Sequence, residues 1–273
     1  MSSAGLSGDR PGLTGDWPGL TGDWSPVTGG ESGAVVLRGP DAYAKCVPAS
    51  GAAELEGERD RVAWLVERGV PGPRVLDWHS DDTGACLVTS AVAGVPADQM
   101  PAAELRIAWE HIADAVRRLH EVPVGDCPFR RDLDTMVAVA RDVVARGAVN
   151  PEFLPEDQQR TPPSELLARL VPQLARRRDQ EALDLVLCHG DLCLPNIILD
   201  PRTLDVSGFV DLGRLGPADR YADLALLLTN ARETWEDEER ALAADLAFAE
   251  RYGVTLDHDR LRFYLHLDPL TWG

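Results

Sequence analysis

HGDLCLPN, residues 189–196, is the segment of the sequence that decides the fold. It directly follows an apolar run at residues 185–187, which is typical of a buried strand. His189, Asp191 and Asn196 therefore lie where a buried strand emerges into a loop, and such loops often carry catalytic groups. We interpret the segment as a candidate catalytic loop.

The spacing of the polar residues in and after this loop matches that of protein-kinase active sites. Four residues separate Asp191 from Asn196, which is the D-x-x-x-x-N spacing of the protein-kinase catalytic loop. A second motif, DLG, begins at Asp211 as DFG does in kinases. Either motif alone is also common in turns and caps, but together and in this order they are specific. His189 is expected to hydrogen-bond the loop backbone, because H-G-D lacks the paired histidine spacing of a metal site.

The hairpin NIILDPRTLDVSGFVDLG predicts how a metal site forms. We expect residues 197–199 to pair antiparallel with residues 208–210. In that register Asn196 lies opposite Asp211, with both side chains on one face. An amide oxygen and a carboxylate could there share Mg²⁺ bound to nucleotide phosphates, because Mg²⁺ prefers oxygen ligands. Asp191 would accept the proton of an attacking hydroxyl.

The sequence before the loop supplies candidate phosphate-binding groups. The stretch GGESG around Ser32 lies between two strand-like runs, so its N–H groups could cover ATP phosphates, although a glycine-rich hairpin turn is the commoner explanation. Lys45, on the next predicted strand, is the only lysine among 27 basic residues, which indicates a position where arginine does not serve. Glu58 in the following helix is placed to form the Lys–Glu pair of an active kinase, with Glu54 and Glu56 as competing candidates.

Hydrophobic patterning predicts an α+β chain with two lobes, and the family resemblance that the motifs carry implies a two-lobed, protein-kinase-like fold. A tail at residues 1–23 repeats PGLTGDW and is expected to be disordered, because glycine and proline recur in every copy. Residues 24–91 contain short β-like runs and a helical stretch from Ala52 to Arg68, which predict a small antiparallel sheet with one helix in a nucleotide-binding lobe. Residues 92–273 are mainly helical, with a strong amphipathic pattern at about 102–120, and carry the catalytic loop and the hairpin.

The charge balance favours a cationic small molecule over nucleic acid as the partner. The chain has 45 acidic and 27 basic residues and a net charge of -18, whereas duplex binding needs a basic face. No apolar run suffices for a membrane span and the N-terminus lacks a signal-peptide pattern, so we expect a cytoplasmic monomer without a membrane partner. The five cysteines contain no C-x-x-C, so we expect reduced, buried thiols and neither a disulfide framework nor a zinc site.

The chain from about Trp24 to Gly273 resembles the aminoglycoside phosphotransferases, and within that family most closely the streptomycin 3''-phosphotransferases. HGDLCLPN matches the catalytic loop of the family and DLGRLGPADRYADLAL its metal segment, while the closer resemblance rests on GGESG, GERDRVAWL, AVNPEFLP and LDPLTWG. The resemblance implies transfer of the ATP γ-phosphate to the 3''-hydroxyl of streptomycin, with ATP and Mg²⁺ as cofactors. Two alternatives stay open: a kinase of another small cationic or sugar alcohol, and a non-catalytic ATP- or drug-binding protein.

The resemblance also implies roles for particular residues. Asp191 becomes the catalytic carboxylate, Asn196 and Asp211 hold Mg²⁺, and Lys45, paired with Glu58, contacts the α- and β-phosphates. The hinge that reads adenine is implied at residues 89–92, through the backbone of Ser90 and Val92.

Carboxylates are expected to wall the substrate site, because streptomycin carries guanidinium and amine groups. The resemblance places the last residues against the substrate, so Asp268 in LDPLTWG is the first candidate, the alternative being a helix cap. Asp219 and the acidic run at residues 233–239 are weaker candidates. Arg214 is expected either to stabilise charge on the transferring phosphoryl group or to form a structural salt bridge to Asp219 or Asp223.

Overall fold

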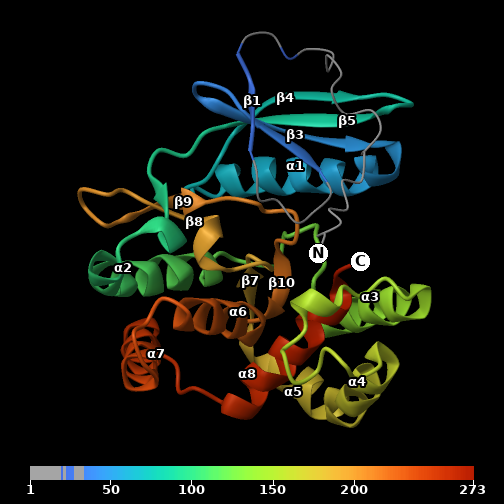
Figure 1. Cartoon of the computed structure of the whole chain (residues 1–273), viewed down its shortest axis with the longest axis vertical. Helices are drawn as coiled ribbons and strands as arrows, with labels where there is room; N and C mark the ends of the chain where they lie inside the picture. Colours follow the sequence, from blue (N-terminus) through green and yellow to red (C-terminus); the bar gives the residue numbers. More distant parts are fainter. Residues whose placement is uncertain (1–19, 21–22, 28–33) are drawn as a thin grey trace, which may run out of the picture. The chain divides into compact units, whose positions relative to one another are not determined.

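The computed structural model describes residues 20, 23–27 and 34–273, and the chain divides into two compact units (Figure 1). The first unit contains the described residues up to Asp60 together with Arg74–Ala91, and the second contains Arg61–Pro73 and Val92–Gly273. Most of the predicted tail at residues 1–23 lies outside the described residues, as does Ser32.

A five-stranded antiparallel sheet forms the first unit, with the strand order β1-β2-β3-β5-β4. Its strands are β1 (Ser25–Pro26), β2 (Val35–Arg38), β3 (Ala42–Pro48), β4 (Val75–Ser80) and β5 (Gly84–Ser90). A short 3-10 turn, η1 (Ala49–Gly51), leads from β3 into helix α1 (Ala52–Glu67). The predicted small antiparallel sheet with one helix is confirmed.

Alternation along β3 decides which residues each face of this sheet carries. Ala44 and Cys46 pack in one buried cluster, whereas Val47 packs in another that contains Leu55 of α1. Because side chains alternate between faces, Lys45 lies on the same face as Val47, the face on which α1 packs. The only lysine of the chain is thereby directed toward this helix.

Cys46 and Cys86 correct the expectation that every cysteine is a reduced thiol. They lie opposite each other on β3 and β5, with Cα atoms 4.2 Å apart, and form a disulfide. Their separation of 40 residues gave no sign of the pair, because only the register of neighbouring strands brings them together. Cys127, Cys188 and Cys193 are free.

The second unit is mainly helical and contains two small antiparallel sheets (Figure 1). One sheet has the order β6-β8-β9 and the other pairs β7 with β10; their bounds are β6 (Val95–Pro96), β7 (Leu185–Cys188), β8 (Ile197–Leu199), β9 (Val206–Phe209) and β10 (Gly216–Asp219). The helices are α2 (Ala102–His120), α3 (Leu133–Arg146), α4 (Pro163–Leu170), α5 (Leu174–Asp184), α6 (Tyr221–Arg232), α7 (Glu238–Tyr252) and α8 (His258–Leu267). Short 3-10 turns are η2 (Ala97–Gln99), η3 (Pro151–Phe153), η4 (Val171–Gln173), η5 (Leu194–Asn196) and η6 (Asp268–Thr271). Within the described part of the chain, none of the helices has the length and apolar character needed to cross a membrane.

Helix α6 lies in the core of the second unit. Most of its residues are buried, and it packs against α7 and α8. A helix that is apolar on nearly all sides belongs in a core, whereas α2 buries one stripe as its amphipathic pattern predicts. Asp223, in the first turn of α6, is the acidic residue of this mostly apolar helix, and its carboxylate is fully buried.

Two glycines with positive φ give a matched test of the packing of the second unit. Gly94 has φ +139°, and a Cβ there would lie 2.3 Å from the carbonyl oxygen of Leu199, while Gly69 has φ +73° and open space. We expect Gly69→Ala to lower the free energy of unfolding by about 1–2 kcal/mol, from backbone conformation alone. Gly94→Ala should cost clearly more, because β6 and β8 must also separate. Equal losses for the two variants in urea denaturation would contradict this packing.

Candidate active site

The loop that begins with HGD is anchored on a single buried carboxylate. Strand β7 ends at Cys188, and the next two backbone N–H groups, of His189 and Gly190, both donate to Asp223, with N···O distances of 2.6 and 2.8 Å. Two parallel hydrogen bonds to one side chain fix the direction in which the chain leaves the strand. Helix α6 therefore determines where the residues after Gly190 lie.

Asp223 is itself held by residues from α2 and α7. Its Oδ2 lies 3.1 Å from Nε2 of His120, and Nδ1 of His120 lies 2.7 Å from the hydroxyl of Tyr252. Burial opposes ionisation of Asp223, but the hydrogen bonds from His120 and Gly190 outweigh it and hold the pKa of this carboxyl below its ordinary value. Ligand atoms of His120, Cys188 and Asp223 lie within 4.8 Å of one another, as in a metal site, yet protein donors already occupy the Asp223 carboxylate.

His189 and Gly190 have the structural roles that the loop requires. Nε2 of His189 donates to the carbonyl oxygen of Val210 at 2.9 Å, and Nδ1 accepts the N–H of Asp191 at 3.2 Å. The interpretation of His189 as a residue that hydrogen-bonds the loop backbone is confirmed. Gly190 has φ +86°, and a Cβ there would lie 2.2 Å from the carbonyl oxygen of Arg214, so only glycine fits.

Asp191 and Asn196 meet across the catalytic loop. Nδ2 of Asn196 donates to the backbone carbonyl of Asp191 at 2.9 Å and to its carboxylate at 3.1 Å. Burial raises the pKa of Asp191, and the negative charges of Asp211 and Asp268 add to the rise. A carboxylate that is oriented by an amide and has a raised pKa is suited to accept a proton.

The register of β8 and β9 corrects the predicted hairpin. Ile197 pairs with Phe209, and the N–H of Val210 donates to the carbonyl of Asn196 at 3.0 Å. Asn196 therefore lies opposite Val210, one residue before the predicted Asp211. The prediction was wrong because β9 spans Val206–Phe209 rather than residues 208–210. Leu199 pairs with Val206, two residues before the predicted Gly208, and an irregularity in the ladder after Ile198 leaves an error of one residue nearer to Asn196.

Asn196 and Asp211 nevertheless supply the oxygen atoms that a hard cation requires. Both follow Asp191 in the order of the kinase motifs, and the charge of Asp211 raises the pKa of Asp191. The side-chain hydrogen bonds of Asn196 use its nitrogen, and in the described part of the chain none engages its Oδ1. Asp211 adopts φ +58°, which is uncommon for a residue other than glycine and is often found at functional sites. A carboxylate and an amide oxygen fit Mg²⁺.

Arg214 and Asp268 belong to one ionic cluster next to η6. Oδ1 of Asp268 lies 3.1 Å from the guanidinium of Arg131 and 3.4 Å from that of Arg214, and Oδ2 accepts the indole N–H of Trp272 at 2.9 Å. Arg214 also donates to the carbonyl and hydroxyl oxygens of Thr271, both at 2.8 Å, and its Cζ lies 3.7 Å from the Trp272 ring centroid. Asp268 lies at the C-terminal end of α8, and its buried carboxylate bonds side chains rather than the backbone N–H groups that a capping carboxylate accepts.

The salt bridge of Arg214 differs from the two predicted alternatives. Its partner is Asp268, whereas Asp219 pairs with Arg260, whose Nε lies 2.7 Å from the carboxylate. Asp219 is fully buried and also accepts the N–H of Tyr221 at 2.9 Å, and burial raises its pKa. In the acidic run at residues 233–239, Glu238 pairs with Arg232.

Lys45 and Glu58 form the ion pair that was predicted for the first unit. Nζ of Lys45 on β3 lies 2.8 Å from the carboxylate of Glu58 on α1. The competing candidates, Glu54 and Glu56, are exposed, and Glu56 pairs with Arg59. The pair follows from the alternation of β3, which turns Lys45 toward the helix.

The predicted hinge residues lie on either side of the division between the units. Ser90 ends β5, where its N–H donates to the carbonyl of Arg74 at 2.8 Å and its hydroxyl accepts the N–H of Arg74 at 2.9 Å. Val92 begins the longer segment of the second unit.

The sequence reasoning missed the anchor of the loop. The sequence indicated Asp223 only as an alternative salt-bridge partner of Arg214. A signal existed, because YADLALLL at residues 221–228 contains one acidic side chain in an apolar run, which indicates a buried and partnered carboxylate. His120 and Arg131 gave no comparable signal, since their partners are distant in sequence.

Residues 23–264 match the phosphotransferase enzyme family (APH), and the chain belongs to this family. A streptomycin 3''-kinase of Streptomyces griseus is 73% identical over 246 residues, which cover 89% of this chain and 90% of the relative. An aminoglycoside 3'-phosphotransferase of Streptomyces fradiae is 45% identical, covering 88% of this chain and 91% of the relative. The solved structure of the aminoglycoside phosphotransferase APH(3'')-Id of Streptomyces rimosus, in complex with ADP and streptomycin, has a TM-score of 0.87 and 63% identity, covering 92% of this chain and 93% of the other. The family and the fold inferred from the sequence are confirmed.

Proposed function

We propose that the protein is a kinase that transfers the γ-phosphate of ATP to the 3''-hydroxyl of streptomycin and thereby inactivates the antibiotic. The observation that carries this proposal is the 73% identity, over 89% of the chain, to a streptomycin 3''-kinase. A relative of 63% identity whose structure contains ADP and streptomycin supports it. The oriented pair of Asp191 and Asn196 gives the chain the means for the chemistry.

In the proposed reaction, the substrate hydroxyl attacks the γ-phosphorus, a new P–O bond forms, and the bond to the β-phosphate oxygen breaks to release ADP. Asp191 accepts the hydroxyl proton. The hydrogen bond from Asn196 holds the Asp191 carboxylate in place, and the raised pKa of Asp191 favours proton acceptance. Phosphoryl transfer depends mostly on positioning and electrostatics, so the fixed loop is the main contribution of the second unit.

The proposed nucleotide contacts follow the kinase motifs. Lys45 contacts the α- and β-phosphates, and Glu58 orients its ammonium through their ion pair. Asn196 and Asp211 hold Mg²⁺, which neutralises charge on the phosphates when it is bound. The remaining proposed contacts are those of Ser32 with the ATP phosphates and of the Ser90 and Val92 backbone with adenine.

We assign the streptomycin side of the site to Asp268, with Arg214 beside it. The charge of Asp268 raises the pKa of Asp191, so the two carboxyl groups lie near each other. Arg214 forms an ion pair with Asp268, and its charge lowers the pKa of Asp191; both observations support a role for Arg214 in offsetting negative charge on the transferring phosphoryl group. Asp219 is the weaker candidate, because Arg260 and the surrounding core enclose its carboxylate.

Transfer from radiolabelled ATP tests the function directly. We expect labelled product with streptomycin, and far slower transfer to choline or to a simple sugar alcohol. Asp191→Ala should keep its melting temperature and its affinity for ADP but turn over slower by about 10²–10⁴-fold, since it lacks the proton acceptor. Equal rates with choline would favour the alternative small-alcohol kinase, and absence of transfer in the folded protein would contradict the proposal.

Lys45→Arg tests why a single lysine remains in the chain. We expect kcat/KM for ATP to fall by about tenfold or more, because a planar guanidinium cannot replace a compact ammonium between Glu58 and phosphate. The matched control is Arg38→Lys on neighbouring β2, an exposed position that should keep normal ATP kinetics. Normal kinetics for Lys45→Arg would remove this argument.

A pair of aspartates separates substrate binding from stability. Asp268→Asn and Asp219→Asn each break a buried ion pair in the second unit, so both should lower the melting temperature. Only Asp268→Asn should raise KM for streptomycin several-fold while leaving KM for ATP unchanged. An unchanged streptomycin KM in folded Asp268→Asn would show that Asp268 is purely structural.

A further inference from the structure

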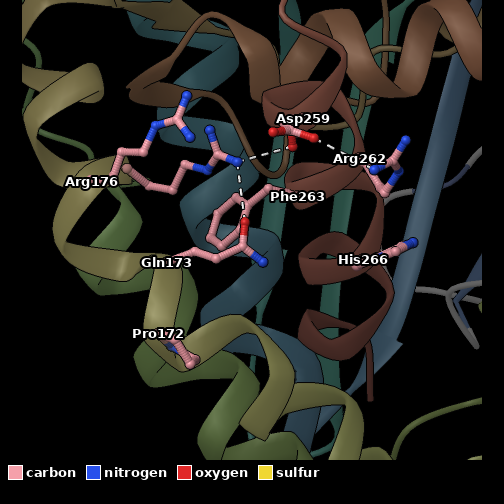
Figure 2. Close-up of a pocket in the computed structure, with 8 residues that line it drawn as sticks. Pro172, Gln173, Arg176, Asp259, Arg262, Phe263 and His266 are labelled. Atoms are coloured by element: carbon pink, nitrogen blue, oxygen red, sulfur yellow. Dashed lines mark hydrogen bonds and ion pairs between the residues drawn. The ribbon is translucent and has the colours of Figure 1, made fainter.

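A cavity of about 300 Å³ lies in the second unit between α8 on one side and η4 with the first turn of α5 on the other. One wall is formed by Asp259, Arg262, Phe263 and His266, which share one face of α8 by their helical spacing. The other wall is formed by Pro172, Gln173, Arg176 and Arg177. Figure 2 shows Gln173 and Arg176 on one helical segment and Asp259, Phe263 and His266 on another. No residue of this cavity belongs to the candidate active site.

Arg177 is a buried cation whose hydrogen-bond partners are all neutral. Arg177 is 2% exposed. Its guanidinium donates hydrogen bonds to the side-chain oxygens of Gln180 at 2.8 Å and Gln173 at 3.1 Å. It also donates to the backbone carbonyl of Asp259 at 3.1 Å. Its Nε has no hydrogen-bond partner. Among the described residues no carboxylate forms a salt bridge with it; the negative charges of Asp257 and Asp259 act on it from further away and do not outweigh its burial.

The other charged groups of the cavity are mostly positive. Arg176 lies 3.9 Å from Asp257 and Arg262 lies 3.5 Å from Asp259, and both arginines are well exposed. These are long, exposed pairs that contribute little. Burial lowers the pKa of His266, and the charge of Arg262 is among the causes that lower it further. Three arginines thus share a cavity with one carboxylate, in a chain whose net charge is -18.

Burial of Arg177 also lowers its pKa, and the positive charge of Arg176 adds to this effect. An anion in the cavity would oppose this lowering of the pKa, because it would add negative charge to that of Asp257 and Asp259. Guanidinium groups match the oxygen geometry of phosphate and bind it through paired hydrogen bonds. The cavity volume is at the lower end of small-molecule sites, so a phosphate group with a small organic part fits.

We propose that this cavity is a second ligand site, which binds a phosphate group, either as free phosphate or on a small phosphate monoester. Arg177 provides a buried positive charge in the lining, and Arg176 and Arg262 provide exposed guanidinium groups. Asp259 repels an anion, but Arg262 offsets that charge. The proposal is independent of the kinase activity, and its test does not use turnover.

Calorimetric titration with inorganic phosphate and with glycerol phosphate tests the proposal. The protein is kept at constant ionic strength and saturated with ADP and Mg²⁺, so that the nucleotide site is occupied. The test variant is the double substitution Arg176→Gln and Arg262→Gln, whose residues are exposed and should not impair folding. The control is Arg106→Gln with Arg141→Gln, two exposed arginines on α2 and α3 that change the net charge equally.

We expect one bound phosphate or phosphate monoester per chain in the original protein and in the control. In the Arg176/Arg262 variant, affinity should fall by about tenfold or more, because paired guanidinium contacts are lost. The probe that binds more tightly identifies the free ion or the monoester as the source. No binding of either probe to the original protein at about 10 mM, or equal binding by test and control variants, would overturn the proposal.

Discussion

The second unit depends on the carboxylate of Asp223. This group accepts the N–H groups of His189 and Gly190, and His120 holds it from α2. A buried carboxylate is stable only when donors compensate its charge, so the core helix α6 and the start of the catalytic loop require each other. Each later position in the loop, including that of Asp191, follows from this anchor.

The proposed active site contains several carboxylates whose negative charges repel one another. Asp191 has a raised pKa because it is buried and because the charges of Asp211 and Asp268 reach it. Arg131 and Arg214 offset the charge of Asp268. Repulsion between carboxylates is a cost for folding, yet it prepares the site for positively charged groups and makes Asp191 a better base. The cavity around Arg177 has the opposite charge balance.

Local pattern and motif order were enough to predict the sheet, α1, α2 and the ion pair of Lys45 with Glu58. The hairpin was predicted, but its register was wrong by two residues at Leu199 and by one at Ile197 and Ile198, because neither the end of the turn nor the irregularity in the ladder leaves a mark in the sequence. The disulfide of Cys46 with Cys86 was missed because strand register alone brings these residues together. Contacts of His120 and Arg131 join residues more than a hundred positions apart, and hydrophobic periodicity carries no information about such partners.

The central claim is that Asp223 acts on catalysis by fixing the loop, and steady-state kinetics of Asp223→Asn test it most directly. In the variant, one carboxylate oxygen is replaced by an NH₂ group, which donates hydrogen bonds and cannot accept them. This group would face N–H donors of His189, Gly190 or His120, so the loop would lose its anchor. We predict that kcat with streptomycin falls by about 10²-fold or more, while KM for ATP changes little and the variant stays folded at the assay temperature. A folded Asp223→Asn enzyme with kcat close to that of the original protein would contradict the account.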